Sequence, residues 1–263
     1  MLGAIIGDVA GSRFEFSSHK TKHFIFLDHG CDATDDSVMT VAVGLTCAEA
    51  DLEDEDAFKA LLVSNMRRLG RQWPDAGYGS HFYHWIFDDT MGPYHSFGNG
   101  SAMRVSPTAW AATSLEQAEE LAAWSAEVTH NHPEGIKGAQ AVAACIYLAR
   151  EGKSKEEIRA YVEKHYYSLA FTLDEIRPTY EFDVTCRGSV PEAIVAFLEA
   201  ESFEDAVRNA ISLGGDGDTQ AAIAGSIAEA YFGIPDHLQE QVFHYLDEAL
   251  ADYYLEYAEV LYH

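Results

Sequence analysis

Two short acidic segments contain side chains that could bind metal ions. They are Thr34-Asp35-Asp36-Ser37 and Gly214-Gly215-Asp216-Gly217-Asp218-Thr219, and each directly precedes an apolar run with a helical pattern. Carboxylates and threonine hydroxyls are hard oxygen ligands, which suit Mg²⁺ or Mn²⁺ and suit zinc or copper poorly. The pattern therefore indicates a site for two divalent cations, formed by Thr34, Asp35, Asp36, Asp216, Asp218 and Thr219.

Taken alone, either segment is also typical of a helix N-cap, because Thr, Asp and Ser oxygens accept the free N–H groups of a first turn. A cap uses one oxygen, however, and two adjacent carboxylates repel each other. No Lys or Arg is interleaved in the second segment, and the helix after it is too apolar for the surface. Buried carboxylates without a cationic partner protonate or bind a cation. The pairing of the two segments therefore favours the metal site, where two cations could polarise substrate oxygens and activate a water.

Two further segments could contact a substrate. In the sequence SFGNGSAMR at residues 96–104, the glycines around Asn99 suit a loop whose backbone N–H groups bind pyrophosphate, and Phe97 could stack on a base. A plain glycine turn is the alternative. The sequence THNHP at residues 129–133 has two histidines but no further ligand at a familiar spacing. We interpret it as hydrogen-bonding or positioning residues, or as a cap for the helix near Gly135.

The elements that must position these side chains are predicted to be helices. Ser114, Ser154, Ser189 and Ser202 each begin a helix-start pattern, and Pro191 suits the first turn of the third of these helices. No alternating pattern predicts a sheet, although residues 22–27 could be extended. The fold class is therefore all-α, with one compact domain over residues 1–263.

Three helical segments have a particular character. The run AAIAGSIAEAYFG is small and apolar, so it predicts a buried helix that ends at Gly233 and Pro235. Residues 237–262 predict one amphipathic helix. Gly3, Gly7 and Gly11 recur every four residues, which favours close contact between two buried helices over a nucleotide-binding loop.

Composition limits the partners and the compartment. The chain has 17 basic and 43 acidic residues, a formal charge of −26, which repels nucleic-acid phosphate and anionic lipid. The four cysteines are scattered and form no C-x-x-C pair, so neither a zinc site nor a disulfide scaffold is indicated. The apolar N-terminal run lacks a basic region and is interrupted by Asp8, unlike a signal peptide. We expect a cytoplasmic monomer that binds neither nucleic acid nor a membrane.

Taken together, these motifs resemble the ADP-ribosylglycohydrolase family. The resemblance extends over nearly the whole chain, and its most specific part is the co-occurrence of TDDS at residues 34–37 with GGDGDT at residues 214–219. Supporting blocks are GAIIGDVAGSRFEF at the start, GNGSAMR at 98–104, THNHP at 129–133 and SVPEAIVAFL at 189–198. Ser37 is a small departure, because Thr is common there, but the hydroxyl is kept.

The resemblance implies an all-helical fold with two Mg²⁺ or Mn²⁺ ions between the TDD and GGDGDT helix starts. It implies that Glu15 lies near the ribose and that His130 lines the pocket. The glycine-asparagine loop would hold diphosphate and ribose through Phe97, Gly98, Asn99, Gly100 and Ser101.

The resulting hypothesis is a hydrolase that releases ADP-ribose from a modified protein side chain. Water would attack the distal ribose with Glu15 or a site aspartate, such as Asp36, as general base, through an oxocarbenium-like transition state. Two alternatives remain open. One is a hydrolase of small-molecule ADP-ribosyl conjugates, and the other is a non-catalytic ADP-ribose-binding or structural member of the fold.

Overall fold

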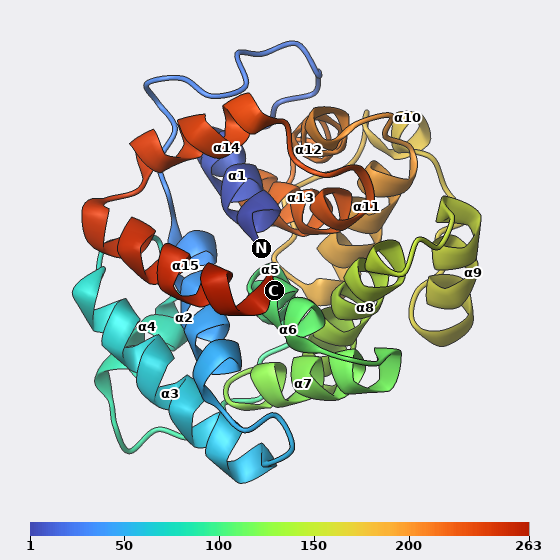
Figure 1. The fold of residues 1–263 in the computed structure, drawn as a ribbon. Coiled ribbons are helices and arrows are strands. Elements are labelled where there is room, and N and C mark those ends of the chain that lie inside the picture. Colours follow the sequence, from blue (N-terminus) through green and yellow to red (C-terminus); the bar gives the residue numbers. More distant parts are fainter. Residues whose placement is uncertain (263) are drawn as a thin grey trace.

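The computed structural model describes residues 1–262 and confirms the all-α class. Within these residues there are fifteen α-helices and two short 3-10 helices, and no strand beyond one isolated bridge between Gly98 and Thr185. Helix α13 (Gly217–Phe232) packs against α1 (Leu2–Gly11), α8 (Pro133–Arg150), α11 (Cys186–Leu198) and α12 (Phe203–Ile211). Of these, α1 and α13 lie in the interior of the molecule (Figure 1).

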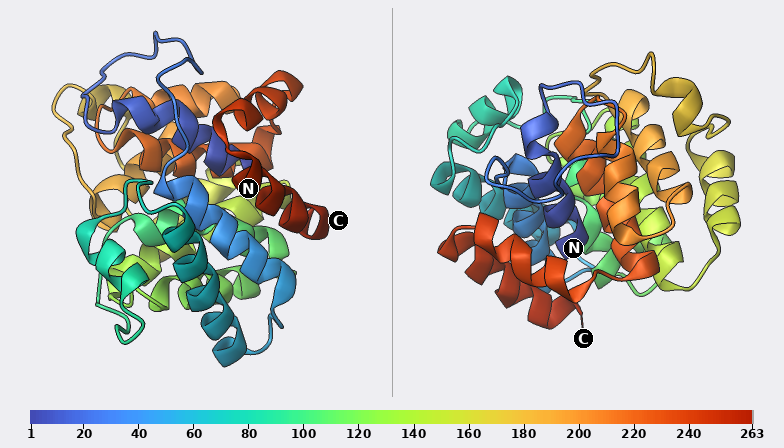
Figure 2. Two further views of the ribbon diagram at one scale, coloured as in Figure 1. Left: turned by 90° about the vertical axis from the view of Figure 1, so that its left-hand side faces the viewer. Right: turned by 90° about the horizontal axis from the view of Figure 1, so that it is seen from above.

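The other helices surround this interior, as the two further views in Figure 2 show. The chain between the first two helices, by contrast, extends outward as a long loop (Figure 2). The surrounding elements are η1 (Ser12–Phe14), α2 (Asp35–Glu49), α3 (Glu55–Gln72), α4 (Ser80–Phe87), α5 (Gly100–Met103), α6 (Ser106–Ala111), α7 (Leu115–Glu127), α9 (Lys155–His165), α10 (Leu173–Ile176), α14 (Asp236–Val242), η2 (Phe243–Tyr245) and α15 (Glu248–Leu261). None of the helices formed by residues 1–262 is long and apolar enough to cross a membrane.

The glycine stripe of α1 determines how the molecule is packed at its centre. Every residue of α1 is buried. A Cβ atom at Gly7 would lie 2.1 Å from the carbonyl oxygen of Ala221, and one at Gly11 would lie 2.4 Å from that of Gly217. Only glycine allows the two helix backbones to approach this closely. The predicted helix contact is confirmed, and it places the start of α13 beside the C-terminal end of α1.

Most predicted helix starts are confirmed, because their caps are local. Ser114, Ser154 and Ser202 each accept a hydrogen bond from the backbone N–H three residues later. The start predicted at Ser189 is wrong, since α11 already begins at Cys186. There Thr185 provides the cap, and its pairing with Gly98 fixes the chain just before the helix.

The single C-terminal helix predicted for residues 237–262 is also wrong. The chain forms α14, then η2, and then α15. The break occurs where Leu246 is extended and Asp247 accepts a hydrogen bond from the N–H of Leu250 at 2.9 Å. An aspartate that caps a new helix outweighs a continuous amphipathic pattern. Residues 22–27 form no strand.

Candidate metal and substrate site

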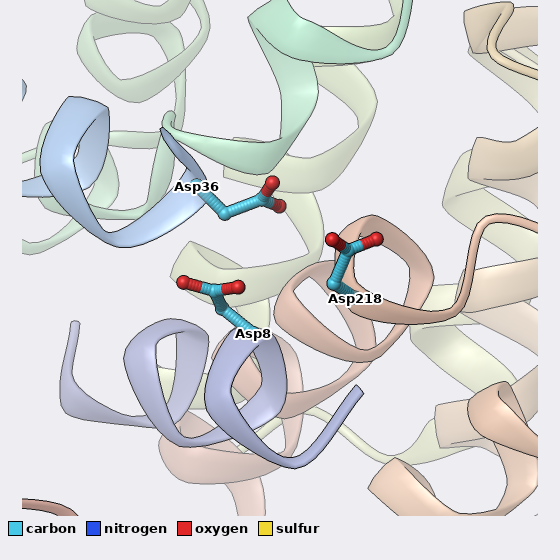
Figure 3. Close-up of side chains that lie close together, drawn as sticks. All are labelled: Asp8, Asp36 and Asp218. Atoms are coloured by element: carbon cyan, nitrogen blue, oxygen red, sulfur yellow. The ribbon is translucent and has the colours of Figure 1, made fainter. Parts of the chain in front are cut away.

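Three helices bring carboxylates together at one point of the interior. Asp8 comes from α1, Asp36 from the first turn of α2, and Asp218 from the first turn of α13, and oxygens of all three lie within 4.8 Å of one another (Figure 3). Glu15, Asp216 and Asp218 form a second group that meets the same distance limit. Because Asp218 belongs to both groups, the carboxylates form one continuous cluster.

The start of α2 combines a helix cap with free carboxylates. The Thr34 hydroxyl accepts a hydrogen bond from the Asp36 N–H at 3.4 Å, so the capping interpretation is right for this residue. The Asp36 side chain is not used in this way. Its Oδ1 is buried and has no hydrogen-bond partner within residues 1–262, while its Oδ2 accepts from the Thr219 hydroxyl at 3.4 Å. A buried oxygen of this kind is an available metal ligand.

At the start of α13, the side chain of Asp216 likewise does not cap the helix. Gly214 has a φ of +64°, a conformation that favours glycine, and the chain turns there into the helix. Asp216 occupies the N-cap position, yet its side chain makes no capping hydrogen bond. Its Oδ2 instead accepts from the Asn99 side-chain amide at 2.8 Å. This bond connects the second acidic segment directly to the glycine-asparagine loop.

Asp8 is a site residue that the sequence interpretation missed. It is fully buried and accepts hydrogen bonds from both the backbone N–H and the hydroxyl of Thr34, at 2.9 and 2.7 Å. It accepts the same pair of bonds from Ser37, the backbone one at 3.0 Å. Asp8 therefore fixes the start of α2 to α1. The available signal was an acidic residue inside a glycine-striped, otherwise apolar helix, which the sequence interpretation used only against a signal peptide.

The cluster is electrostatically costly without a cation. Burial raises the pKa of Asp8 to about 6, and burial together with Asp216 and Asp8 raises the pKa of Glu15 to about 7. Burial and mutual repulsion also raise the pKa values of Asp35, Asp36 and Asp218 well above the ordinary value. None of these carboxylates forms an ion pair with the Lys or Arg residues of the described chain.

The cluster lies at one side of a pocket with a volume of about 750 Å³. Its lining includes the predicted residues Glu15, Asp35, Asp36, Phe97, Gly98, Asn99, Gly100, His130, Asp216, Asp218 and Thr219. The loop at residues 97–99 is held in place by hydrogen bonds to the segment before α11, from the Asn99 N–H to Val184 and from the Cys186 N–H to Phe97. Phe97 remains half exposed at the pocket.

Two predicted residues have placements that differ from the rest. The Ser101 hydroxyl is fully buried and donates to the carbonyl of Gly135 at 2.7 Å, so it points away from the pocket. Thr34 is not among the lining residues either, and its hydroxyl donates to Asp8, the member of the cluster that does not line the pocket.

The two histidines of THNHP have separate positions. His132 is the N-cap of α8, where its Nδ1 accepts from the Glu134 N–H at 3.0 Å, so the capping interpretation is right for His132. His130 is buried at the pocket wall. Burial, and then the charge of Arg104, lowers the pKa of His130 well below its ordinary value. A neutral ring at this position can donate or accept one hydrogen bond toward a ligand.

Comparison with known proteins agrees with this architecture. The chain is 27% identical to human ADP-ribosylhydrolase ARH3, over 91% of this chain and 87% of the relative. It is 26% identical to the ADP-ribosyl-[dinitrogen reductase] glycohydrolase of Rhodospirillum rubrum, over 89% and 85% of the two chains. A solved structure described as an ADP-ribosylglycohydrolase-related protein complex shares the fold, with a TM-score of 0.65, 23% identity and 96% of each chain covered.

The family model described as ADP-ribosylglycohydrolase matches residues 1–263, the whole chain. The resemblance inferred from TDDS and GGDGDT is thereby confirmed, and the chain belongs to the ADP-ribosylglycohydrolase family.

Proposed function

We propose that this protein is a hydrolase that cleaves the glycosidic bond between ADP-ribose and a modified protein side chain, with two divalent cations, Mg²⁺ or Mn²⁺. The observation that carries the proposal is the carboxylate cluster of Asp8, Glu15, Asp36, Asp216 and Asp218 beside a 750 Å³ pocket that also contains the glycine-asparagine loop. Membership of the family supports ADP-ribose as the group that is released.

The residues present fit divalent cations. Every ligand atom offered is an oxygen, and the Oδ1 of Asp36 is buried without a partner in the described chain. The ligands would be Thr34, Asp35, Asp36, Asp216, Asp218 and Thr219, with Asp8 fixing the orientation of Thr34. When bound, the cations would supply Lewis-acid polarisation of substrate oxygens and neutralise the cluster.

Glu15 is positioned to move a proton. It is half-buried, lines the pocket and belongs to the same carboxylate group as Asp216 and Asp218. Without cations, burial and the charges of Asp216 and Asp8 raise the pKa of Glu15 to about 7. Cations that neutralise these aspartates would lower that pKa, so that Glu15 is an ionised carboxylate able to act as a base near neutral pH. Glu15 can therefore accept a proton from the attacking water, while the nearby carboxylates stabilise the positive charge that develops on the ribose.

The glycine-asparagine loop supplies donors for the diphosphate. The N–H groups of Gly98 and Asn99 are already bonded, to Ser96 and Val184. The N–H groups of Gly100 and Ser101, by contrast, have no hydrogen-bond partner within residues 1–262. Gly100 lines the pocket, so its N–H is available to an anion. Ser101 is completely buried outside the pocket lining and donates its hydroxyl to Gly135, so it would support the loop and not contact the diphosphate.

An ADP-ribose release assay tests this proposal. Arginine-linked, serine-linked and small-molecule ADP-ribosyl conjugates would be supplied in turn, each with Mg²⁺ or Mn²⁺. We expect release from at least one protein conjugate, and loss of release in Asp36→Asn and Asp218→Asn. Asp252→Asn, an exposed change of the same charge, is the control. Full activity of either site variant would refute the metal assignment.

Two other outcomes would replace the proposal. Release from small conjugates alone would assign the protein to that substrate class. Metal-dependent stabilisation without any release would indicate a binding protein.

A further inference from the structure

Arg104 is a buried cation beside the pocket that no carboxylate contacts. It is 1% exposed, it lines the pocket, and it forms no ion pair with an acidic residue of the described chain. One guanidinium nitrogen donates to the carbonyl of Ser125 at 3.0 Å and to the hydroxyl of Thr129 at 2.8 Å. Burying an unpaired charge is costly, so Arg104 must have a role other than neutralising a neighbour.

The contact with Thr129 determines which way that hydroxyl can donate. The Thr129 Oγ1 lies 2.7 Å from Nδ1 of His130, and these are its two hydrogen-bond partners within residues 1–262. A guanidinium has only donors, so Arg104 occupies a lone pair of the hydroxyl. The hydroxyl proton then has one acceptor within reach, which is Nδ1 of His130.

The opposite arrangement would leave a buried donor unsatisfied. If Nδ1 carried the proton and donated to Thr129, the Thr129 hydroxyl proton would have no acceptor, although this residue is completely buried. An unsatisfied buried donor destabilises the folded protein. A second N–H donor on the same oxygen would also place its partial positive charge close to the guanidinium of Arg104. Both effects favour an unprotonated Nδ1.

The other ring nitrogen of His130 points toward the substrate loop. A Cβ atom built on Gly100 would lie 3.1 Å from Nε2, and one on Gly98 would lie 3.6 Å from it. Nε2 has no hydrogen-bond partner within the described chain, whereas Nδ1 is hydrogen-bonded to the Thr129 hydroxyl. A neutral ring that is unprotonated at Nδ1 carries its proton at Nε2.

We infer that Arg104 and Thr129 are positioning residues that hold His130 in the Nε2–H form, so that it is a fixed hydrogen-bond donor to an oxygen of the bound nucleotide. This inference rests on the proposed function, because the acceptor would be a diphosphate or ribose oxygen of ADP-ribose. Arg104 acts in this arrangement through Thr129, to which its guanidinium donates. Its charge acts through the Thr129 hydroxyl and also disfavours a cationic His130 ring.

Nitrogen NMR of histidine-labelled protein tests the tautomer directly. Long-range proton–nitrogen spectra distinguish a protonated ring nitrogen from a bare one, and comparison with His130→Gln identifies the signal among the 12 histidines. We expect a protonated Nε2 and a bare Nδ1 at neutral pH. A protonated Nδ1, alone or together with Nε2, would overturn the inference whether or not ADP-ribose binds.

Thr129→Val and Thr129→Ser form a matched pair. Valine removes the hydroxyl at nearly constant shape, so we expect a mixture of tautomers and an affinity for ADP-ribose about threefold to tenfold lower by calorimetry. Serine keeps the hydroxyl and should preserve both the spectrum and the affinity. An unchanged spectrum and affinity in a folded Thr129→Val protein would overturn the inference.

The wild-type spectrum remains decisive if Thr129→Val does not fold. The two proposals also fail separately. An Nε2–H ring in a protein that does not bind ADP-ribose would support the role of Arg104 and Thr129, and would refute the proposed function together with the hydrogen bond from His130 to the nucleotide.

Discussion

Asp8→Asn should stabilise the metal-free protein, although Asp8 accepts hydrogen bonds from two residues. Burial raises the pKa of Asp8 from 3.8 to about 6. Since each pKa unit corresponds to about 1.4 kcal/mol, the ionised side chain destabilises the metal-free fold by about 3 kcal/mol at neutral pH. Asparagine removes this charge.

The substitution also removes a hydrogen bond, and the geometry shows which one. The amide oxygen of asparagine can replace Oδ2, which accepts from the N–H groups of Thr34 and Ser37 and from the Ser37 hydroxyl. The amide nitrogen would then face the Thr34 hydroxyl, which now donates to Oδ1 at 2.7 Å. Loss of that one bond costs about 1 kcal/mol, so the expected net stabilisation is on the order of 2 kcal/mol.

The pH dependence gives this prediction a second signature. The pKa of Asp8 in the folded protein lies above its ordinary value, so wild type has its full stability below about pH 3.8 and loses it as the pH rises toward 6. Asp8→Asn lacks this loss. The variant should therefore be the more stable protein by about 2 kcal/mol above pH 6, and the difference should reverse below pH 4, where only the lost hydrogen bond remains and wild type is favoured by about 1 kcal/mol.

Urea unfolding in EDTA, followed by tryptophan fluorescence at several pH values, measures both quantities. Asp252→Asn, an exposed change of the same charge, controls for the general effect of net charge. Destabilisation by Asp8→Asn at neutral pH, or a stability difference that does not vary with pH, would refute the conclusion that burial dominates the energy of this carboxylate.

Three further predictions concern the cations, the base and the helix contact. Mg²⁺ or Mn²⁺ at 100 times its dissociation constant should stabilise EDTA-treated wild type by about 2.7 kcal/mol for each cation bound in the same unfolding assay, and Asp218→Asn should lose this gain. Glu15→Gln should lower the single-turnover rate of ADP-ribose release by about 10²–10⁴-fold; a rate within a few-fold of wild type would exclude Glu15 as the base. Gly7→Ala should lower the free energy of unfolding by about 1–3 kcal/mol or more, because its Cβ would meet the backbone of Ala221, whereas Gly92→Ala, with nothing within 4 Å, should not.

Local features of the sequence predicted much of the fold and of the candidate site. A helix cap needs one side chain and a neighbouring N–H, so the starts after Ser114, Ser154 and Ser202 could be read from a few residues. The predicted helix boundaries were wrong where a contact with a distant residue, or a competing cap, determines where the helix begins. Thr185 starts α11 early because it pairs with Gly98, about ninety residues away along the chain.

The sequence by itself determined the all-helical class, the family, and the two acidic segments, because periodicity, caps and motifs are properties of neighbouring residues. Only the tertiary structure decided which oxygens those segments present. It brought Asp8 into hydrogen-bonding contact with Thr34, left an oxygen of Asp36 without a partner, and turned the Ser101 hydroxyl away from the pocket. It also connected Arg104 to His130 through Thr129. Burial and hydrogen-bond direction depend on residues that meet only in the folded chain, so no spacing along the sequence could supply them.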